Sequence, residues 1–352
     1  MHQRSASDLH LKVGNHPLLR VHGRLEPQTD LPRLDSATAR ALIESMMTEA
    51  QLEKFQTMLE LDFAYSLPGV SRFRVNVYQQ RGSMGAAIRA VPMGVPTIDH
   101  LGLPPVVKQL ADLPRGLVLV TGPTGSGKST TLAAIINHVN QTRAVHIMTI
   151  EDPIEYLHRD AKSAINQREI GMDTLSFANA LRHVLRQDPD VILIGEMRDL
   201  ETISTAVTAA ETGHLVFATL HTQSAAQTID RIIDVFPAHQ QSQIRMQLSV
   251  ALEGVLSQTL LPRADGAGRV AAIEVMLASG AIRNLIREGK THQLPSAIMS
   301  GGKEGMQTLD QALRTLVEQK KVTYEEAAAK ASSAKDFAAL MGRQPAPAAK
   351  AS

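Results

Sequence analysis

The sequence predicts an α/β protein in which a small α+β unit precedes a parallel sheet covered by helices on both faces. From about Pro105 onward, strongly apolar strands alternate with helical segments, which is typical of βαβ units. A glycine loop at residues 122–129 lies between the first of these strands and the next helix. Before residue 91, polar and apolar residues alternate instead, as in half-buried strands.

The first domain is predicted to span residues 1–91. DLHLKV (8–13) and RFRVNV (72–77) read as its half-buried strands. One face of the second strand carries Phe73, Val75 and Val77. Between the two strands, Ser36 can cap a helix that runs to about Glu60. Apolar residues recur along this helix at helical spacing: Leu42, Met46, Phe55 and Leu59.

A linker rich in Pro and Gly is predicted at residues 92–104, followed by the second domain at 105–342 and a disordered tail at 343–352. The second domain is expected to contain four apolar strands: LVLV (117–120), HIMTI (146–150), VILI (191–194) and LVFATL (215–220). Beyond about residue 225 the pattern turns helical, with helices expected near 239–259, 281–288, 308–319 and 324–340.

The composition narrows the possible functions. A chain of 352 residues with 43% hydrophobic residues can build about two domains with real cores. The chain has 36 Lys and Arg residues against 35 Asp and Glu, so its net charge gives no indication of nucleic-acid binding. The absence of Cys excludes a disulfide framework, a zinc ribbon and a thiol nucleophile. No apolar run approaches the ~18 residues of a membrane span, and the N-terminus lacks a signal-peptide core. A cytoplasmic protein is expected, with a peripheral membrane role left open.

The glycine loop from Gly122 to Ser129 matches the pattern G-x-x-x-x-G-K-[ST] completely. Its backbone N–H groups and the following helix N-terminus can face a phosphate, while Lys128 reaches the β- and γ-phosphates. The hydroxyl of Ser129 is the expected ligand of Mg²⁺. The predicted nucleotide-binding residues are Gly122, Pro123, Thr124, Gly125, Ser126, Gly127, Lys128, Ser129 and Thr130.

Reactive side chains follow the other three strands, where ligands of parallel sheets bind. A carboxylate there can polarise an attacking water or hold the hydration shell of Mg²⁺. Glu196 is the first candidate for polarising water and Glu151 the second, and their division of labour stays open. Because Glu196 stands where a metal-shell Asp is usual, it can serve the metal, the water or both.

Two histidines bracket the last of these strands. His221, at its carboxyl end, is the better candidate for sensing the γ-phosphate. His214, seven residues earlier, would lie about 23 Å away on the opposite face. It either faces a neighbouring subunit or is a buried histidine with its hydrogen bonds satisfied.

Arginines are also grouped. Four gather near the end of the first domain: Arg72, Arg74, Arg81 and Arg89. Arg182 and Arg186 lie one helical turn apart in LRHVLRQDPD. Such residues suit bidentate phosphate contacts, including contacts across an interface, and equally suit surface ion pairing.

Four strings resemble, in order, the Walker A motif, Asp box, Walker B motif and His box of the secretion ATPases, which drive type II secretion and type IV pilus dynamics. They are GPTGSGKSTT, TIEDPIEY, LRQDPDVILIGEMRDLETI and TGHLVFATLHT. AIRNLIREGK (281–290) and SGGKEGMQTLDQAL (300–313) are similar to segments of the type IV pilus retraction branch. The zinc-binding cysteines of many assembly and secretion ATPases are missing, which also favours retraction.

The resemblance implies a PAS-like N-terminal domain, joined to a RecA-like P-loop ATPase domain with a helical C-terminal part. It implies a homohexameric ring that hydrolyses ATP with Mg²⁺, with nucleotide between the two domains. Catalytic roles are implied for Glu196, Glu151, His221, Arg74 and Arg89. The ring would act on an inner-membrane pilus platform protein, so the chain would be cytoplasmic and peripheral at the inner membrane. Pilus disassembly and twitching motility would follow.

Several alternatives stay open. The chain could be an accessory retraction paralogue, or a pilus extension or type II secretion ATPase. From other classes, a nucleic-acid translocase is disfavoured because aromatics are 3% with no Trp. A non-hydrolysing scaffold is disfavoured because every position expected for hydrolysis is filled.

Family members usually begin with a helix before the first strand, where only MHQRSA stands here. A misassigned start codon and a short chain both explain that difference.

Overall fold

The computed structural model describes residues 1, 4, 6–21, 23–67, 70–91, 94–266 and 268–343. Linker positions 92 and 93, and the predicted tail from residue 344 on, lie outside the described residues. The chain divides into two compact units, the first made of 1–94 with 155–157, the second of 95–154 with 158–352. Part of the predicted linker belongs to the second unit, because Ile98 and Leu103 are buried in that unit's core.

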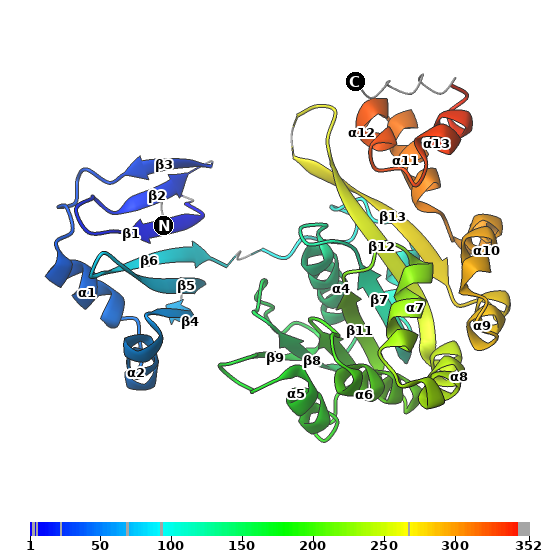
Figure 1. Ribbon diagram of the computed structural model, residues 1–352, viewed down its shortest axis with the longest axis horizontal. Helices are drawn as coiled ribbons and strands as arrows, with labels where there is room; N and C mark the ends of the chain where they lie inside the picture. Colours follow the sequence, from blue (N-terminus) through cyan, green and yellow to red (C-terminus); the bar gives the residue numbers. More distant parts are fainter. Residues whose placement is uncertain are drawn as a thin grey trace. The chain divides into compact units, whose positions relative to one another are not determined.

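The first unit is a six-stranded antiparallel sheet packed against two helices (Figure 1). Its strand order is β3-β2-β1-β6-β5-β4. The strands are β1 (Asp8–Leu11), β2 (Leu18–Val21), β3 (Arg24–Pro27), β4 (Glu60–Leu67), β5 (Ser71–Gln80) and β6 (Ser83–Ala90). The helices are α1 (Ser36–Glu44) and α2 (Glu49–Met58). Phe73, Val75 and Val77 face the helices and are buried as the alternation predicted.

The single helix predicted from Ser36 to about Glu60 is wrong, because the chain forms two helices there. Thr48 starts the second helix with a capping box. Its side chain accepts a hydrogen bond from the backbone N–H of Gln51, and the side chain of Gln51 accepts one from the backbone N–H of Thr48. Leu59, with a positive φ of 63°, ends it. Leu42 and Leu59 are 45% and 54% exposed. The four apolar residues at helical spacing therefore do not form one buried helix face.

The second unit is built on a seven-stranded sheet in the order β13-β12-β7-β11-β10-β8-β9. Neighbours are parallel except β12 and β13. The strands are β7 (Gly116–Thr121), β8 (His146–Glu151), β9 (Ala164–Glu169), β10 (Val191–Ile194), β11 (Leu215–Leu220), β12 (Leu252–Pro262) and β13 (Arg269–Leu277). The four predicted strands are therefore neighbours in the middle of the sheet, and their carboxyl ends meet at one edge.

Helices cover both faces of this sheet. Val118 and Val120 of β7 pack in one core with α3 (Val106–Ala111) and α4 (Lys128–Thr142). Leu117 and Leu119 point into the other core. That core also contains residues of α5 (Phe177–Val184), α6 (Leu200–Glu211), α7 (Ala225–Asp234), α8 (Gln241–Ala251), α9 (Gly280–Arg287) and α10 (Leu294–Ser300).

The helix predicted at 239–259 is wrong in its second half, where the chain forms β12. Most of β12 is buried, including its polar residues Ser257 and Gln258, so its sequence is a run without strict alternation of apolar and polar residues. Such a run cannot be distinguished from a buried helix by periodicity. The antiparallel partner β13 and the edge strand β9 were missed as well.

The C-terminal helices form a small core of their own against the β12–β13 hairpin (Figure 1). They are α11 (Leu309–Glu318), α12 (Tyr324–Ala328) and α13 (Ala334–Leu340). Short 3₁₀ turns occur at Ala238–Gln240, Thr291–Gln293 and Gly302–Glu304. Within the described ranges, no helix is long and apolar enough to cross a membrane.

The AIRNLI segment forms α9, with Ile282 and Ile286 fully buried and Leu285 partly buried. Its arginine has a structural role in the unit. Arg283 donates to the carbonyls of Ser249 (3.0 Å) and Val250 (2.7 Å), the last turn of α8. It also forms a bidentate ion pair with Glu253, at 2.9 Å to each oxygen.

Replacing Arg283 by Ala is expected to lower the free energy of unfolding by about 2 kcal/mol, because charged hydrogen bonds to half-buried acceptors are lost. Urea denaturation measures this change. Arg287→Ala is the matched control, since Arg287 lies on the same helix and is exposed. Equal stability of the two variants would contradict the role of Arg283 in joining α8 to α9.

Candidate active site

The phosphate loop joins β7 to α4 at the carboxyl edge of the sheet. Three of its glycines have positive φ angles, at 142° for Gly122, 79° for Gly125 and 89° for Gly127. Other residues rarely adopt this backbone. The Lys128 ammonium folds over the loop and donates to the carbonyls of Gly122 (2.8 Å) and Pro123 (3.1 Å). The hydroxyl of Ser126 is buried without a hydrogen-bond partner among the described residues.

These features fit a nucleotide phosphate. The lysine can exchange two carbonyl contacts for a bound anion, and the N-terminus of the 15-residue helix α4 favours negative charge. Ser129 lies in the first turn of that helix, where its hydroxyl can join a Mg²⁺ held mainly by phosphates and water. No cluster of three or more His, Asp or Glu side chains suited to a metal occurs in the described part of the chain.

Glu196 and His221 are brought together at the ends of neighbouring strands β10 and β11. The carboxylate of Glu196 is 3.0 Å from Nε2 of His221. On its other side, Nη2 of Arg198 donates to Glu196 at 2.7 Å. The Glu196 side chain is 18% exposed, whereas His221 is 44% exposed and accessible to a ligand.

The surroundings of Glu196 keep it ionised. Its partial burial opposes ionisation, but the hydrogen bonds and positive charges of Arg198 and His221 outweigh burial and lower its pKa. A carboxylate with a lowered pKa can orient a water and accept a hydrogen bond from it throughout the physiological pH range. This pair is therefore the candidate catalytic pair at the strand ends.

Removing Arg198 is expected to shift the acidic limb of the pH–rate profile upward. The hydrogen bond and positive charge of Arg198 lower the pKa of Glu196, so Arg198→Ala lets that pKa rise toward its ordinary value. Activity that needs the ionised carboxylate should then fall at a higher pH than in the unchanged protein. The measurement is kcat at saturating ATP from about pH 7 down to about pH 3, so that it covers the range below the ordinary pKa of a glutamate. Superimposable acidic limbs would contradict a role for ionised Glu196.

Glu151, at the end of β8, has different partners. Its Oε1 accepts from the hydroxyl of Thr149 at 2.7 Å and from Nε2 of Gln167 at 3.0 Å. The backbones of the two acids are adjacent, since the N–H of Gly195 donates to the carbonyl of Ile150 at 2.7 Å. Both carboxylates thus lie at the same sheet edge, but the His221 contact belongs to Glu196.

His214 lies at the opposite end of β11 from His221. Its Nδ1 is 3.0 Å from the carbonyl of Ala209, and the ring is half-buried. Two interpretations of His214 were open, a contact with a neighbouring subunit or a histidine with its hydrogen bonds satisfied. This geometry favours the second.

The arginines of the first unit separate into two places. Arg74 and Arg89 face each other across β5 and β6, and Arg89 donates to Asp8 at 2.8 Å. Arg81 lies in the turn of this hairpin with a positive φ of 49°. It is seven residues along β5 from Arg74, or about 23 Å, so the two cannot share one phosphate. In the second unit, Arg182 forms an ion pair with Glu201.

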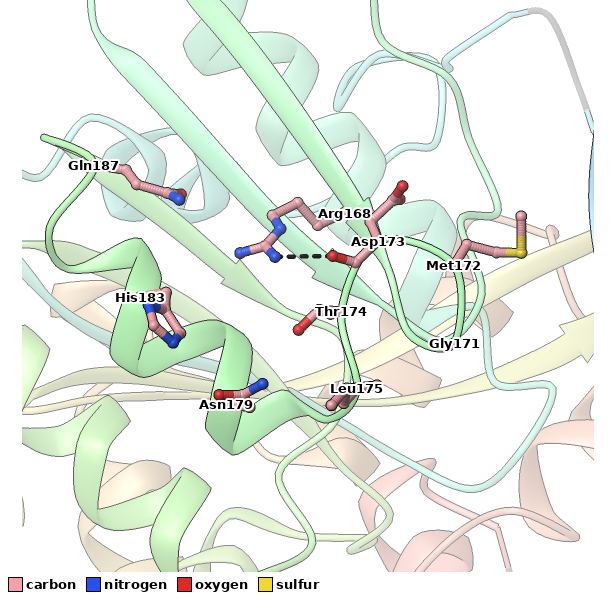
Figure 2. A pocket seen from close by; sticks show the side chains of 9 residues that line it. All are labelled: Arg168, Gly171, Met172, Asp173, Thr174, Leu175, Asn179, His183 and Gln187. Carbon is pink, nitrogen blue, oxygen red and sulfur yellow. Dashed lines mark hydrogen bonds between the residues drawn. The ribbon is translucent and has the colours of Figure 1, made fainter.

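A separate pocket of about 500 Å³ opens between the loop after β9 and α5 (Figure 2). Arg168 reaches across it and donates to the carbonyl of Asp173 at 2.9 Å. Leu175 at its rim is 85% exposed. The lining contains neither the strand-end acid Glu196 nor any residue of the phosphate loop, so this pocket is distinct from the candidate active site.

Two residues near the site were not predicted from the sequence. Arg198 lies two positions after Glu196, so proximity in GEMRD could have suggested it. Gln258 contacts the phosphate loop from β12, 132 residues away from its partner Ser126. No local pattern points to it.

The chain is similar to several known proteins. The model of the family described as Type II/IV secretion system protein matches residues 86–334. The chain is 53% identical to the Type IV pilus retractation ATPase PilT of Pseudomonas aeruginosa, over 95% of this chain and 97% of that protein. It is 50% identical to a Twitching motility protein of Neisseria gonorrhoeae, covering 91% and 86%. The crystal structure of the pilus retraction motor PilT with bound ADP superposes with a TM-score of 0.88, at 49% identity and 95% coverage of both chains.

Proposed function

The chain belongs to the type II/IV secretion system protein family, and from that membership we propose that it is the P-loop ATPase that powers type IV pilus retraction. It binds nucleotide at the phosphate loop and hydrolyses ATP to ADP and phosphate. The work done on each cycle withdraws pilin subunits from the base of the fibre, which produces twitching motility. The alternative of a pilus extension or type II secretion ATPase is less consistent with the high identity to two retraction and twitching proteins.

The observation that carries the proposal is the contact between the ionised carboxylate of Glu196 and His221, at the strand ends that share a sheet edge with the phosphate loop. Lys128 and the N-terminus of α4 bind the phosphates, and Ser129 helps to hold Mg²⁺. Glu196 orients the attacking water and accepts a hydrogen bond from it. His221 is placed to report whether a γ-phosphate is present, because its ring contacts Glu196 and is exposed. Glu151 supports the same sheet edge.

Arg74 and Arg89 are proposed to add positive charge to the nucleotide from the first unit. Their direct opposition across β5 and β6 supports this role, because it sets two guanidinium side chains on neighbouring strands. We propose that six copies form the working ring. The partner that transmits the motion is proposed to be the inner-membrane platform protein of the pilus, which would hold this cytoplasmic chain at the membrane.

Deleting the gene in its own host tests the retraction function. Cells that keep surface pili but no longer retract them, and recover with the intact gene but not with a Lys128→Ala copy, would support the proposal. Loss of surface pili would instead indicate an extension ATPase. Retraction that persists until a second ATPase gene is also deleted would indicate the accessory paralogue. The molecular mass of the protein in solution with ADP tests the ring separately. A monomer with full ATPase activity would contradict the proposal of six copies.

A further inference from the structure

Gln258 stands beside the phosphate loop although it belongs to β12. That strand pairs in parallel with β7, with Leu256 opposite Val120 and Ser257 opposite Thr121. The next residue along, Gln258, therefore lies level with Gly122, the first residue of the loop. Its side chain is buried, at 3% exposed.

Both ends of the Gln258 amide are used on the loop and its helix. Nε2 donates to the carbonyl of Ser126 at 2.6 Å. Oε1 accepts from the hydroxyl of Thr131 at 2.9 Å. Since the Ser126 carbonyl can only accept, the amide has one orientation that satisfies both bonds. The bridge spans Gly127, Lys128, Ser129 and Thr130, four of the predicted nucleotide-binding residues.

Close packing adds to the two hydrogen bonds. A Cβ at Gly122 would lie 2.3 Å from the backbone oxygen of Gln258. A Cβ at Gly127 would lie 3.1 Å from Nε2 of Gln258. The glycines thus permit β12 to approach the loop, and β12 in turn sets the path of the loop.

The bond to Ser126 also decides which way the loop presents its next N–H. In a trans peptide, the carbonyl and the following N–H point to opposite sides. Holding the Ser126 carbonyl toward β12 therefore turns the N–H of Gly127 away from β12. A carbonyl turned to the other side would repel an anion where an N–H attracts it.

We propose that Gln258 is a positioning residue for nucleotide binding, which holds the Ser126 carbonyl away from the phosphate site so that the Gly127 N–H faces it. This inference rests on the proposed nucleotide-binding function of the loop. Gln258 contacts the loop and not the water-orienting residues. It therefore acts on nucleotide affinity, and the rate at saturating ATP depends on it little.

The test compares full-length unchanged protein with Gln258→Met, which keeps side-chain length and removes both hydrogen bonds. The Kd for ADP is expected to rise at least about tenfold, the cost of breaking a buried hydrogen-bonded bridge. KM for ATP should rise in parallel, with kcat within about twofold. Gln307→Met is the matched control, because the Gln307 amide donates to a backbone carbonyl, that of Ile273, at 2.8 Å without touching the loop. Its Kd should equal that of the unchanged protein.

A folded Gln258→Met protein with an ADP Kd within about twofold of the unchanged value would overturn the inference. So would a fall in kcat with KM unchanged. If Gln258→Met does not fold, Thr131→Val decides, because it removes one bond at nearly constant volume and should raise Kd about threefold. An unchanged Kd there would also overturn it. If the unchanged protein does not bind nucleotide, both this inference and the proposed function are overturned. If the unchanged protein hydrolyses ATP but the Gln258 variant has the same Kd for ADP, only this inference is overturned.

Discussion

Replacing Glu196 by Gln is expected to lower kcat for ATP hydrolysis by about 10²–10⁴-fold while nucleotide binding persists. The amide keeps the size of the side chain but cannot accept a proton or carry the negative charge that orients water. It also loses the ion pair with Arg198 and the charged contact with His221. Because none of these groups belongs to the phosphate loop, the Kd for ADP should change little.

Steady-state turnover and ADP titration of the same preparation measure the two quantities. Glu201→Gln is the matched control, since Glu201 is a nearby exposed carboxylate that pairs with Arg182. Its kcat should stay within about twofold of the unchanged value. If Glu196→Gln retained most of its activity while Glu151→Gln lost it, the water-orienting role would pass to Glu151.

Gly122→Ala is expected to abolish measurable nucleotide binding. The added Cβ would meet the backbone oxygen of Gln258 at 2.3 Å and the hydroxyl of Ser126 at 2.6 Å. The first of these atoms is in the backbone of a buried strand, so the loop would have to move instead. The residue also has a φ of 142°, which alanine rarely adopts. Both effects displace the N–H groups that bind phosphate.

The Kd for ADP, together with the melting temperature, measures this effect. Gly213→Ala separates strain from the clash, because Gly213 has a φ of 120° but no atom within 4 Å of a Cβ. That variant should lose about 1–3 kcal/mol of stability and keep its nucleotide affinity. Tight ADP binding by Gly122→Ala would show that the loop can adopt its binding shape without close contact to β12.

The sequence located most of the second unit because its signals are local. Apolar runs at 117–120, 146–150, 191–194 and 215–220 each became a central strand. Parallel strands buried on both faces require such runs, so residue type alone reports them. Glu196 and His221 could be named as candidates for the same reason. Each lies within two residues of the end of its strand, and the carboxyl ends of parallel strands meet at one edge.

The two failures have different causes, because burial that depends on distant partners explains one and a local helix cap explains the other. β12 was read as helix because packing on both faces removes any alternation, and only its pairing with β7 and β13 makes it a strand. The helix predicted through residue 60 was divided by the Thr48 cap, a local bond that competed with the apolar spacing.

By itself, the sequence determined a phosphate loop between strand and helix, a parallel sheet, and acids with a histidine at its edge, because each depends on residues a few positions apart. Only the tertiary structure decided that Glu196 contacts His221, and that Arg81 lies far from Arg74. It alone placed Gln258 against the loop. These contacts join residues from separate strands, and their geometry is fixed by strand order and register, which no local pattern encodes.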